Sequence, residues 1–378
     1  MEIFNNMKKV KVMSVFGTRP EAIKMCPLVK KLEDHPQIDS YVCLTGQHRE
    51  MLAQVINIFD IRIDYDLNIM RPQQTLTTIT SDVLVGMVGI LDKEEPDLVL
   101  VHGDTTTSFV VALAAFYQKI PVGHVEAGLR TNDMYSPFPE EMNRTLTGHI
   151  ATLHFAPTET SRNNLFAENI CQNIFITGNT VIDSFKYTVK DNYLFKNDAL
   201  KSLDLSNKRL ILMTAHRREN LGTPMKDIFR AVKRIAQDYR DVLVVYPVHL
   251  NPAVKDTAFS ILGDVKGVML IEPIEVDDMH NLMARSFLVL TDSGGLQEEA
   301  PSFGVPVIVL RTETERPEAV DAGTVKIAGV NEDDIYSHVT LLLDSKSEYM
   351  KMAKAINPYG DGHASERVVK AILEWSNK

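Results

Sequence analysis

The stretch "DLVLVHGDTTTSFVVALAAFYQKIPVGHVEAG", residues 97–128, contains the unit from which the fold is built. The apolar runs at 97–103 and 121–128 are typical of buried strands, and the run at 107–120 between them is typical of a helix. Strands that are apolar along their whole length are buried on both faces, and a helix between two of them makes them parallel. This stretch therefore predicts a parallel sheet covered by helices on both faces.

The same alternation of strand and helix runs through two series along the chain. Between the series, residues 179–205 are polar and weakly patterned. We predict an α/β protein with two Rossmann-like domains, whose parallel sheets face a central cleft. The expected strands are 10–16, 39–46, 97–103, 121–128, 153–158 and 173–179 in the first series, and 208–216, 241–249, 267–273, 287–295, 306–310 and 323–329 in the second.

The composition excludes several classes of protein. A formal net charge of −10 over 378 residues argues against a nucleic-acid partner. No apolar run reaches the roughly 18 to 20 residues of a membrane span, and the N-terminus lacks the core of a signal peptide. The three cysteines have no metal-binding or redox spacing. We expect a cytoplasmic protein with no membrane partner, in which residues 1–6 form a short extension.

The polar residues after the first strand, "FGTRPEAIK" (16–24), form a candidate anion site. Ligands of open parallel sheets bind beyond the carboxyl ends of the strands. A tight turn at Gly17 leads into a helix whose free amides attract phosphate, and Arg19 and Lys24 would add positive charge. The alternative is an ordinary turn with a solvated arginine.

A second candidate phosphate site is "TDSGGLQEEAP" (291–301). Ser293 can cap the helix that follows, and Gly294 and Gly295 allow backbone amides to approach a diphosphate closely. Glu299, about one turn later, can accept hydrogen bonds from both hydroxyls of a ribose. The alternative is a capped helix with acidic residues near its start, which the helix dipole also favours.

Three carboxylates are candidates for acid/base chemistry. Asp104 and Glu126 each end an apolar strand, and Glu140 lies in the loop-like segment "YSPFPEEMNRT" (135–145). Neighbouring carboxylates in different environments can hold different protonation states. Taken singly, each could be structural, and Asp104 could cap the helix beginning at "TTTS". Glu141 is expected to be a solvated helix residue.

His216, in "TAHRREN" (214–220), ends the first strand of the second series. Its ring could bind a diphosphate or protonate a leaving oxygen. The alternative is an ion-paired loop formed with Arg217, Arg218 and Glu219. Neither the histidines nor the aspartates show the spacing of a metal site, so we expect metal-independent chemistry.

These motifs together resemble the non-hydrolysing UDP-N-acetylglucosamine 2-epimerases of bacteria, from about residue 10 to the C-terminus. The resemblance also includes "TGQHREML", "PEEMNRTLTGH", "FITGNTVID", "VYPVHLNP", "RTETERPEA" and "NPYGDG". It implies a glycosyltransferase-B-type fold and a homodimer. It places the C-terminal helix on the first domain, which gives an N-terminal domain of 1–178 plus 366–378 and a C-terminal UDP-binding domain of 179–365.

The activity implied is the reversible conversion of UDP-GlcNAc to UDP-ManNAc, by anti-elimination of UDP through a 2-acetamidoglucal and re-addition. The product would supply ManNAc for cell-surface polysaccharide, with neither metal nor NAD as cofactor. The implied catalytic residues are Asp104, Glu126, Glu140 and His216, and the implied UDP-binding residues are Arg19, Lys24, Ser293, Gly294, Gly295, Glu299 and Arg316.

Some members of the family bind a second UDP-GlcNAc as an allosteric activator. Positions of that kind match Gln47, Gln74, Arg217 and His249. Gln73 departs from the arginine expected in the regulated relatives. A glycosyltransferase of the same fold, a hydrolysing epimerase and a nucleotide-sugar sensor without catalysis are the alternative functions.

Overall fold

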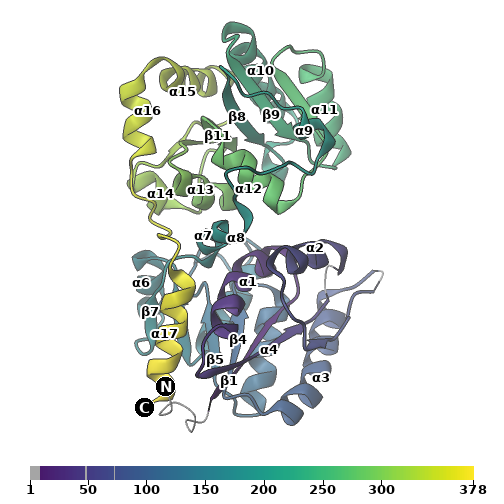
Figure 1. Cartoon of the computed structure of the whole chain (residues 1–378), viewed down its shortest axis with the longest axis vertical. Coiled ribbons are helices and arrows are strands. Elements are labelled where there is room, and N and C mark those ends of the chain that lie inside the picture. The colour runs from purple at the N-terminus through teal and green to yellow at the C-terminus, as the bar shows by residue number, and fades with distance from the viewer. Residues whose placement is uncertain (1–8, 47–48, 72) are drawn as a thin grey trace. The chain divides into compact units, whose positions relative to one another are not determined.

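The computed structural model describes residues 9–46, 49–71 and 73–378. The chain forms two compact units, one of Met1–Tyr187 with Tyr359–Lys378 and the other of Thr188–Pro358. Each unit contains one parallel sheet with helices packed against it (Figure 1). Among the described residues, no helix combines the length and the apolar character needed to cross a membrane.

The first unit is built on a seven-stranded sheet in the order β3-β2-β1-β4-β5-β6-β7, with every neighbouring pair parallel. β4 is buried along its whole length, as its apolar sequence predicts. The two-residue strand β3 was not predicted, because it has no apolar run. The strands are β1 (Val10–Phe16), β2 (Ile38–Leu44), β3 (Tyr65–Asp66), β4 (Leu98–His102), β5 (Val122–Val125), β6 (Leu153–Ala156) and β7 (Ile174–Ile176).

The helices of the first unit begin at threonine caps where the turns carry the candidate site. Thr18 and Glu21 form a capping box at the start of α1, and Thr105 caps α4. The helices are α1 (Arg19–Glu33), α2 (Arg49–Phe59), α3 (Leu76–Glu94), α4 (Thr106–Tyr117), α5 (Glu140–Ile150), α6 (Glu159–Ala167), α7 (Thr180–Asp183), α8 (Phe185–Thr188, which ends at the first residue of the second unit) and α17 (Ala364–Ser376).

The returning C-terminal segment is attached to the first unit by hydrogen bonds. The Asp183 carboxylate accepts from the amides of Ala364 and Ser365, at 3.1 and 2.9 Å. The amide of Asn179 donates to the carbonyl of Tyr359 at 2.7 Å, and α17 packs against α1 (Figure 1). Because of these contacts the first unit extends to Tyr187 and resumes at Tyr359, whereas the boundaries drawn from the sequence were 178 and 366.

The second unit is built on a six-stranded sheet in the order β10-β9-β8-β11-β12-β13, again parallel throughout. Its strands coincide with the six predicted, each shorter by a few residues. They are β8 (Arg209–Thr214), β9 (Val242–Pro247), β10 (Val268–Ile271), β11 (Leu288–Thr291), β12 (Val307–Val309) and β13 (Val325–Ile327).

The helical segments of the second unit are α9 (Asp198–Lys201), η1 (Arg218–Asn220), α10 (Thr223–Asp238), α11 (Pro252–Leu262), α12 (Val276–Ala284), α13 (Gly294–Glu299), η2 (Ala300–Phe303), α14 (Pro317–Asp321), α15 (Glu332–Asp344) and α16 (Lys346–Ala353).

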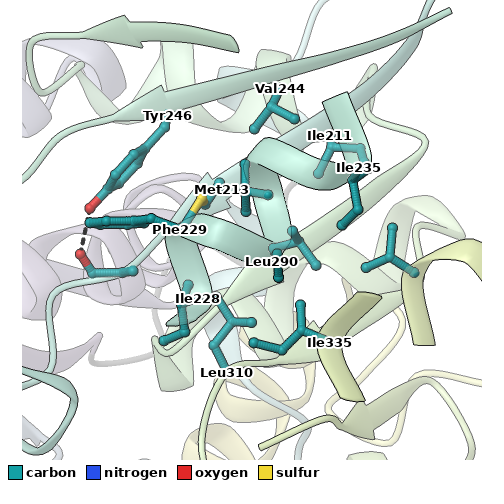
Figure 2. Packing of buried hydrophobic residues seen from close by; sticks show 14 of the residues in the cluster. Ile211, Met213, Ile228, Phe229, Ile235, Val244, Tyr246, Leu290, Leu310 and Ile335 are labelled. Atoms are coloured by element: carbon teal, nitrogen blue, oxygen red, sulfur yellow. Dashed lines mark hydrogen bonds between the residues drawn. The ribbon is translucent and has the colours of Figure 1, made fainter. Parts of the chain in front are cut away.

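The core of the second unit lies between α10, α15 and the central strands (Figure 2). Phe229 of α10 packs against Tyr246 of β9, with ring centroids 5.8 Å apart. The Tyr246 hydroxyl donates to the carbonyl of Ala215 at 2.7 Å, which satisfies two buried polar groups beside the end of β8. The core thus supports the loop that follows β8.

We predict that Tyr246→Phe destabilises the second unit. The substitution leaves the buried Ala215 carbonyl without this donor, at a cost of about 1–3 kcal/mol. Native-state hydrogen exchange of the amides in β8 and β9 should accelerate by roughly 5- to 150-fold, the equivalent of that free energy. Tyr336→Phe is the control, because its hydroxyl donates to Asp238 at the surface. Equal exchange rates in the two variants would contradict the prediction.

Candidate active site

Glu21 is a buried carboxylate that joins the turn after β1 to the turn after β4. It is 2% exposed. Its Oε2 accepts from the amides of Gly17 and Thr18, at 3.0 and 2.7 Å. Its Oε1 accepts from the hydroxyls of Thr105 and Ser108, at 2.7 and 3.0 Å. The two turns are therefore held together by one acidic side chain.

This arrangement corrects one expectation about the turn after β1. Free amides were expected at the start of this helix, but Glu21 already accepts the hydrogen bonds of the two amides that precede it, those of Gly17 and Thr18. The capping box produces this geometry, because Glu21 occupies the third helical position. The candidate anion-binding groups left here are the half-buried Arg19 and Lys24 side chains.

Asp104 directly follows the turn at the end of β4. Thr105 caps α4 and accepts from the Ser108 amide at 3.0 Å, so the alternative that Asp104 caps this helix is wrong. Gly103 has a φ of +61°, which a glycine adopts readily, and its carbonyl accepts from His124 Nε2 at 2.7 Å. The backbone is thereby fixed just before the Asp104 carboxylate.

Partial burial raises the pKa of Asp104 to about 6. Its side chain is 30% exposed, and Arg144 Nη1 lies 3.6 Å from its Oδ2. The charges of Arg144 and Lys24 lower this pKa, whereas those of Glu126 and Glu140 raise it. The other two predicted acid/base carboxylates, Glu126 and Glu140, therefore both lie close enough to Asp104 to affect its pKa.

Glu126, at the end of β5, is tied to side chains from three other elements. Its carboxylate pairs with the Lys24 ammonium and accepts from Asn179 Nδ2 at 2.8 Å. The Nε2 atom of the buried His102 lies 3.8 Å from Glu126 Oε2. Glu126 has a φ of +63°, a left-handed conformation that costs a residue with a side chain roughly 1 kcal/mol or more. Lys24, predicted as a UDP ligand, thus lies beside a predicted acid/base residue.

Glu140 and Glu141 differ from their predicted environments. Glu140 is the first residue of α5, rather than part of a loop. Glu141 was expected to be solvated, but it is 4% exposed. Its Oε1 accepts from the amides of Thr131 and Asn132, at 3.0 and 2.9 Å, because that loop folds back over the start of the helix.

Glu141 also orients Arg144, one turn later on α5. Its Oε2 accepts from Arg144 Nε at 2.7 Å, and Arg144 Nη1 then reaches toward Asp104. Asn143, on the same helix, donates to the carbonyl of Asp104 at 2.9 Å. Within the part of the chain that the structure describes, the carboxylates of Asp104 and Glu140 accept no hydrogen bond. These two acids remain available to a substrate.

In the second unit, the two glycines that begin α13 lie among the other predicted UDP-binding residues. A Cβ atom on Gly294 would lie 3.7 Å from Arg316 Nη2, and one on Gly295 would lie 3.2 Å from Glu299 Oε1. Ser293 occupies the cap position, but its side chain makes no capping hydrogen bond, contrary to expectation. Its hydroxyl is therefore not engaged as a cap of α13.

Arg316 and Glu299 are held by buried neighbours. Arg316 Nε pairs with the carboxylate of Glu298. Glu299 Oε2 lies 3.4 Å from Nε2 of the buried His280, whose Nδ1 lies 2.8 Å from the Thr188 hydroxyl. The side chains around the two glycines are thus fixed before any ligand binds.

His216 follows β8 and lies against the first residue after β11. Its amide donates to Asp292 Oδ2 at 2.8 Å, and its Nδ1 lies 3.3 Å from Asp292 Oδ1. Burial lowers the pKa of His216, and the Asp292 charge opposes that effect. The ring stacks on His249, with centroids 5.4 Å apart and planes 9° from parallel. Arg217 Nε donates to the carbonyl of Asp292 at 3.3 Å.

The positions matched to an activator site fall in both units. Arg217 and His249 lie beside His216 in the second unit. Gln74 lies in the first unit and donates to the carbonyl of Ile69. Gln47 lies outside the described residues. In the described ranges, no group of three or more His, Cys, Asp or Glu side chains could hold a metal ion.

The comparisons with known proteins identify the family. A family model described as UDP-N-acetylglucosamine 2-epimerase matches residues 30–373. This chain belongs to that family. The epimerase of Bacillus subtilis is 57% identical over 97% of this chain and 96% of its own length. The UDP-GlcNAc 2-epimerase of Neisseria meningitidis, in a crystal structure with UDP-GlcNAc, has a TM-score of 0.88 and 50% identity over 97% of this chain and 100% of its own.

A glycotransferase of kitacinnamycin has a TM-score of 0.67 over 97% of this chain and 99% of its own length, at 9% identity. At that identity the likeness is one of fold alone. The predicted epimerase family and the predicted class of fold, with two Rossmann-like parallel sheets of the glycosyltransferase-B type, are therefore confirmed.

In both units, sequence reasoning missed side chains that surround the predicted site residues. They include Glu21, Arg144 and Asp292, which touch predicted residues or hold the turns that carry them. Thr18 and Glu21 have the spacing of a capping box, so Glu21 could have been found. Glu141 and Arg144 have the spacing of a helical ion pair. Asp292 is part of no local sequence pattern that would have predicted its contacts.

We predict that Arg144→Gln raises the pKa of Asp104 by about one unit, because it removes a neighbouring positive charge. In the wild type, the Asp104 carboxyl should be mostly ionised at pH 7 and mostly protonated below about pH 6. Carbon-13 NMR of aspartate labelled at the carboxyl carbon measures the titration directly. The control is Arg162→Gln, whose partner Glu159 lies on the surface of α6. An unchanged midpoint in Arg144→Gln would show that Arg144 does not act on Asp104.

Proposed function

We propose that this protein interconverts UDP-N-acetylglucosamine and UDP-N-acetylmannosamine by inverting the configuration at C2 of the sugar. The observation that carries the proposal is the group of three carboxylates in the first unit, in which Asp104 has a pKa of about 6. Membership of the epimerase family supports the substrate. So does the Neisseria meningitidis relative, whose structure contains UDP-GlcNAc.

The chemistry requires an elimination, because the C2 proton of an N-acetylhexosamine is not adjacent to a carbonyl group. Departure of UDP from C1, with the electron pair of the C1–O bond, leaves an oxocarbenium-like centre. This centre acidifies the C2–H bond, and a carboxylate removes the proton to give 2-acetamidoglucal and UDP. Addition of a proton to the opposite face of C2 and return of UDP to C1 give the epimer. The elimination and the addition together are an isomerisation, so no oxidant or reductant is needed.

In this mechanism the departing diphosphate is stabilised by cations and by backbone amides. The proposed ligands from the second unit are Arg316, the amides of Ser293 to Gly295, and His216. Glu299 accepts hydrogen bonds from the ribose hydroxyls. The support is that Arg316 and Glu299 both lie against the two glycines of α13. Arg19 and Lys24 are the proposed contributions of the first unit.

The proton transfers at C2 are assigned to Asp104, Glu126 and Glu140. A group with a pKa near the working pH can both accept and release a proton, and Asp104 meets this condition. A pair of such groups must serve the two faces of C2, because removal and return of the proton occur on opposite sides. Exclusion of water from the oxocarbenium-like centre is a further requirement.

The elimination needs neither hydride transfer nor a Lewis acid, so no NAD and no metal are included. We propose a cytoplasmic homodimer that supplies ManNAc for cell-surface polysaccharide. A second UDP-GlcNAc would act as an activator through Gln47, Gln74, Arg217 and His249. Turnover of pure UDP-ManNAc would then require added UDP-GlcNAc.

We predict that the pure protein, incubated with UDP-GlcNAc alone in heavy water, forms UDP-ManNAc carrying deuterium at C2. Solvent deuterium enters because the proton removed from C2 exchanges before another is returned. Proton NMR follows both the product and the loss of the C2–H signal. Retention of the original hydrogen would exclude the elimination. Free ManNAc would indicate a hydrolysing epimerase, and unchanged UDP-GlcNAc a transferase or a sensor.

We predict that Asp104→Asn lowers turnover at least about a hundredfold, as expected for the loss of an acid/base group. UDP should still bind, because Asp104 is not among its proposed ligands. Initial rates measure the first effect and titration calorimetry the second. Asp92→Asn, an exposed substitution in α3 of the same unit, is the control. Turnover within a few-fold of the wild type in Asp104→Asn would remove Asp104 from the mechanism.

A further inference from the structure

Asp292 is a fully buried carboxylate between β11 and α13, with no exposed surface. Its Oδ2 accepts three hydrogen bonds from the loop after β8. The donors are the amides of His216 and Arg217, both at 2.8 Å, and Asn220 Nδ2 at 3.1 Å. This oxygen therefore holds the backbone of the loop that contains His216.

The other oxygen of the same carboxylate faces the His216 ring. Asp292 Oδ1 is buried and accepts no hydrogen bond in the described part of the chain. His216 Nδ1 lies 3.3 Å from it. A buried carboxylate oxygen without a donor is costly, and the ring nitrogen is positioned to supply one with a small rotation of the ring.

We propose that Asp292 is a positioning residue for His216. Asp292 holds the proton of the neutral ring on Nδ1, so a second proton, taken from solvent, binds at Nε2 and is exchanged from there with the departing diphosphate oxygen. The role of Nε2 rests on the proposed function. The tautomer is a property of the protein without substrate and can be measured separately.

The tautomer follows from the donors and acceptors present. An ionised carboxylate only accepts hydrogen bonds, and a neutral imidazole has one donor and one acceptor nitrogen. With the proton on Nε2, the lone pair of Nδ1 would face the Asp292 carboxylate across 3.3 Å in a buried site. With the proton on Nδ1, the same contact is attractive. The parallel ring of His249 covers one face of the imidazole and limits its reorientation.

Asp292 also favours the charged form of His216. Burial lowers the pKa of His216, as do the neighbouring His249 and Arg217, whereas Asp292 and Glu219 raise it. These groups come from the loops after β8, β9 and β11. The carboxylate therefore allows a half-buried histidine to take up a proton when the reaction requires it.

The variant Asp292→Asn should reverse the tautomer. Three donors converge on the position of Oδ2, so the amide oxygen of the asparagine must occupy that position. The amide nitrogen then faces His216 Nδ1 and donates to it. Nδ1 becomes the acceptor, and the proton moves to Nε2. The hydrogen bonds that hold the loop are retained.

The experiment is nitrogen-15 NMR of the full chain labelled at histidine, without ligand and above the pKa of His216, with His216→Gln to assign the signals. The expected result is the Nδ1–H tautomer in the wild type and the Nε2–H tautomer in Asp292→Asn. The variant should also lose about 10²- to 10⁴-fold in kcat, with a much smaller change in KM for UDP-GlcNAc.

Glu219→Gln is the matched control, since it removes a nearby negative charge from an exposed side chain and leaves the loop amides paired. It should keep the Nδ1–H tautomer. An Nε2–H tautomer in the wild type overturns the proposal even if Asp292→Asn fails to fold. An unchanged tautomer in a folded Asp292→Asn overturns it too, because Asp292 would then only hold the loop.

Reversal of the tautomer with full kcat would overturn the part assigned to Nε2. Absence of epimerase activity in the wild type would instead refute the proposed function, and the tautomer result would still decide how Asp292 orients His216.

Discussion

A loop that buries backbone amides must provide acceptors for them, and in this protein buried carboxylates do so. Glu21, Glu141 and Asp292 each accept from two amides of a loop at the carboxyl end of a strand, and each also accepts from a side chain. Asp183 likewise accepts from the first two amides of α17, and Asp278 from the amides of Lys196 and Asn197. Removal of one such acceptor leaves several buried donors without a partner, and each unpaired donor costs about 1–3 kcal/mol of stability.

This constraint separates two kinds of acid that look alike in the sequence. Acids that accept hydrogen bonds from loop amides have their carboxylate oxygens engaged, and they hold the backbone of the loop in place. Asp104 and Glu140 accept no hydrogen bond at their carboxylates among the described residues, and Asp104 has a raised pKa. Glu126 differs from both kinds, because the side chains of Lys24 and Asn179 bind its carboxylate. An acid that accepts no loop amide can exchange a proton without the loss of a backbone hydrogen bond. One that is bound by backbone amides would lose those hydrogen bonds on protonation.

The sequence predicts the sheets well, because a parallel strand buried on both faces needs an unbroken apolar run. β3, with two residues, gives no such run. α5 begins with two acids directly after a proline-containing segment, so its start was predicted to be a loop. The candidate acids at strand ends were found for the same topological reason. The environment of Glu141 was not, because it depends on a loop folding back over α5. Nor was the Lys24–Glu126 pair, whose partners lie 102 positions apart. Local patterns carry no information on such contacts.

In each unit, carboxylates hold cations that lie beside predicted site residues. Lys24 pairs with Glu126, Arg144 with Glu141, and Arg316 with Glu298. A cation fixed in this way loses less rotamer entropy when an anion binds, so more of the interaction energy remains for the ligand. It also keeps its orientation while charge moves during a reaction, which is the condition for electrostatic stabilisation. The net charge of −10 is thus compatible with a nucleotide diphosphate. Some of the acids that contribute to this negative charge orient the positive groups. The proposed substrate would therefore bind to cations that are already oriented.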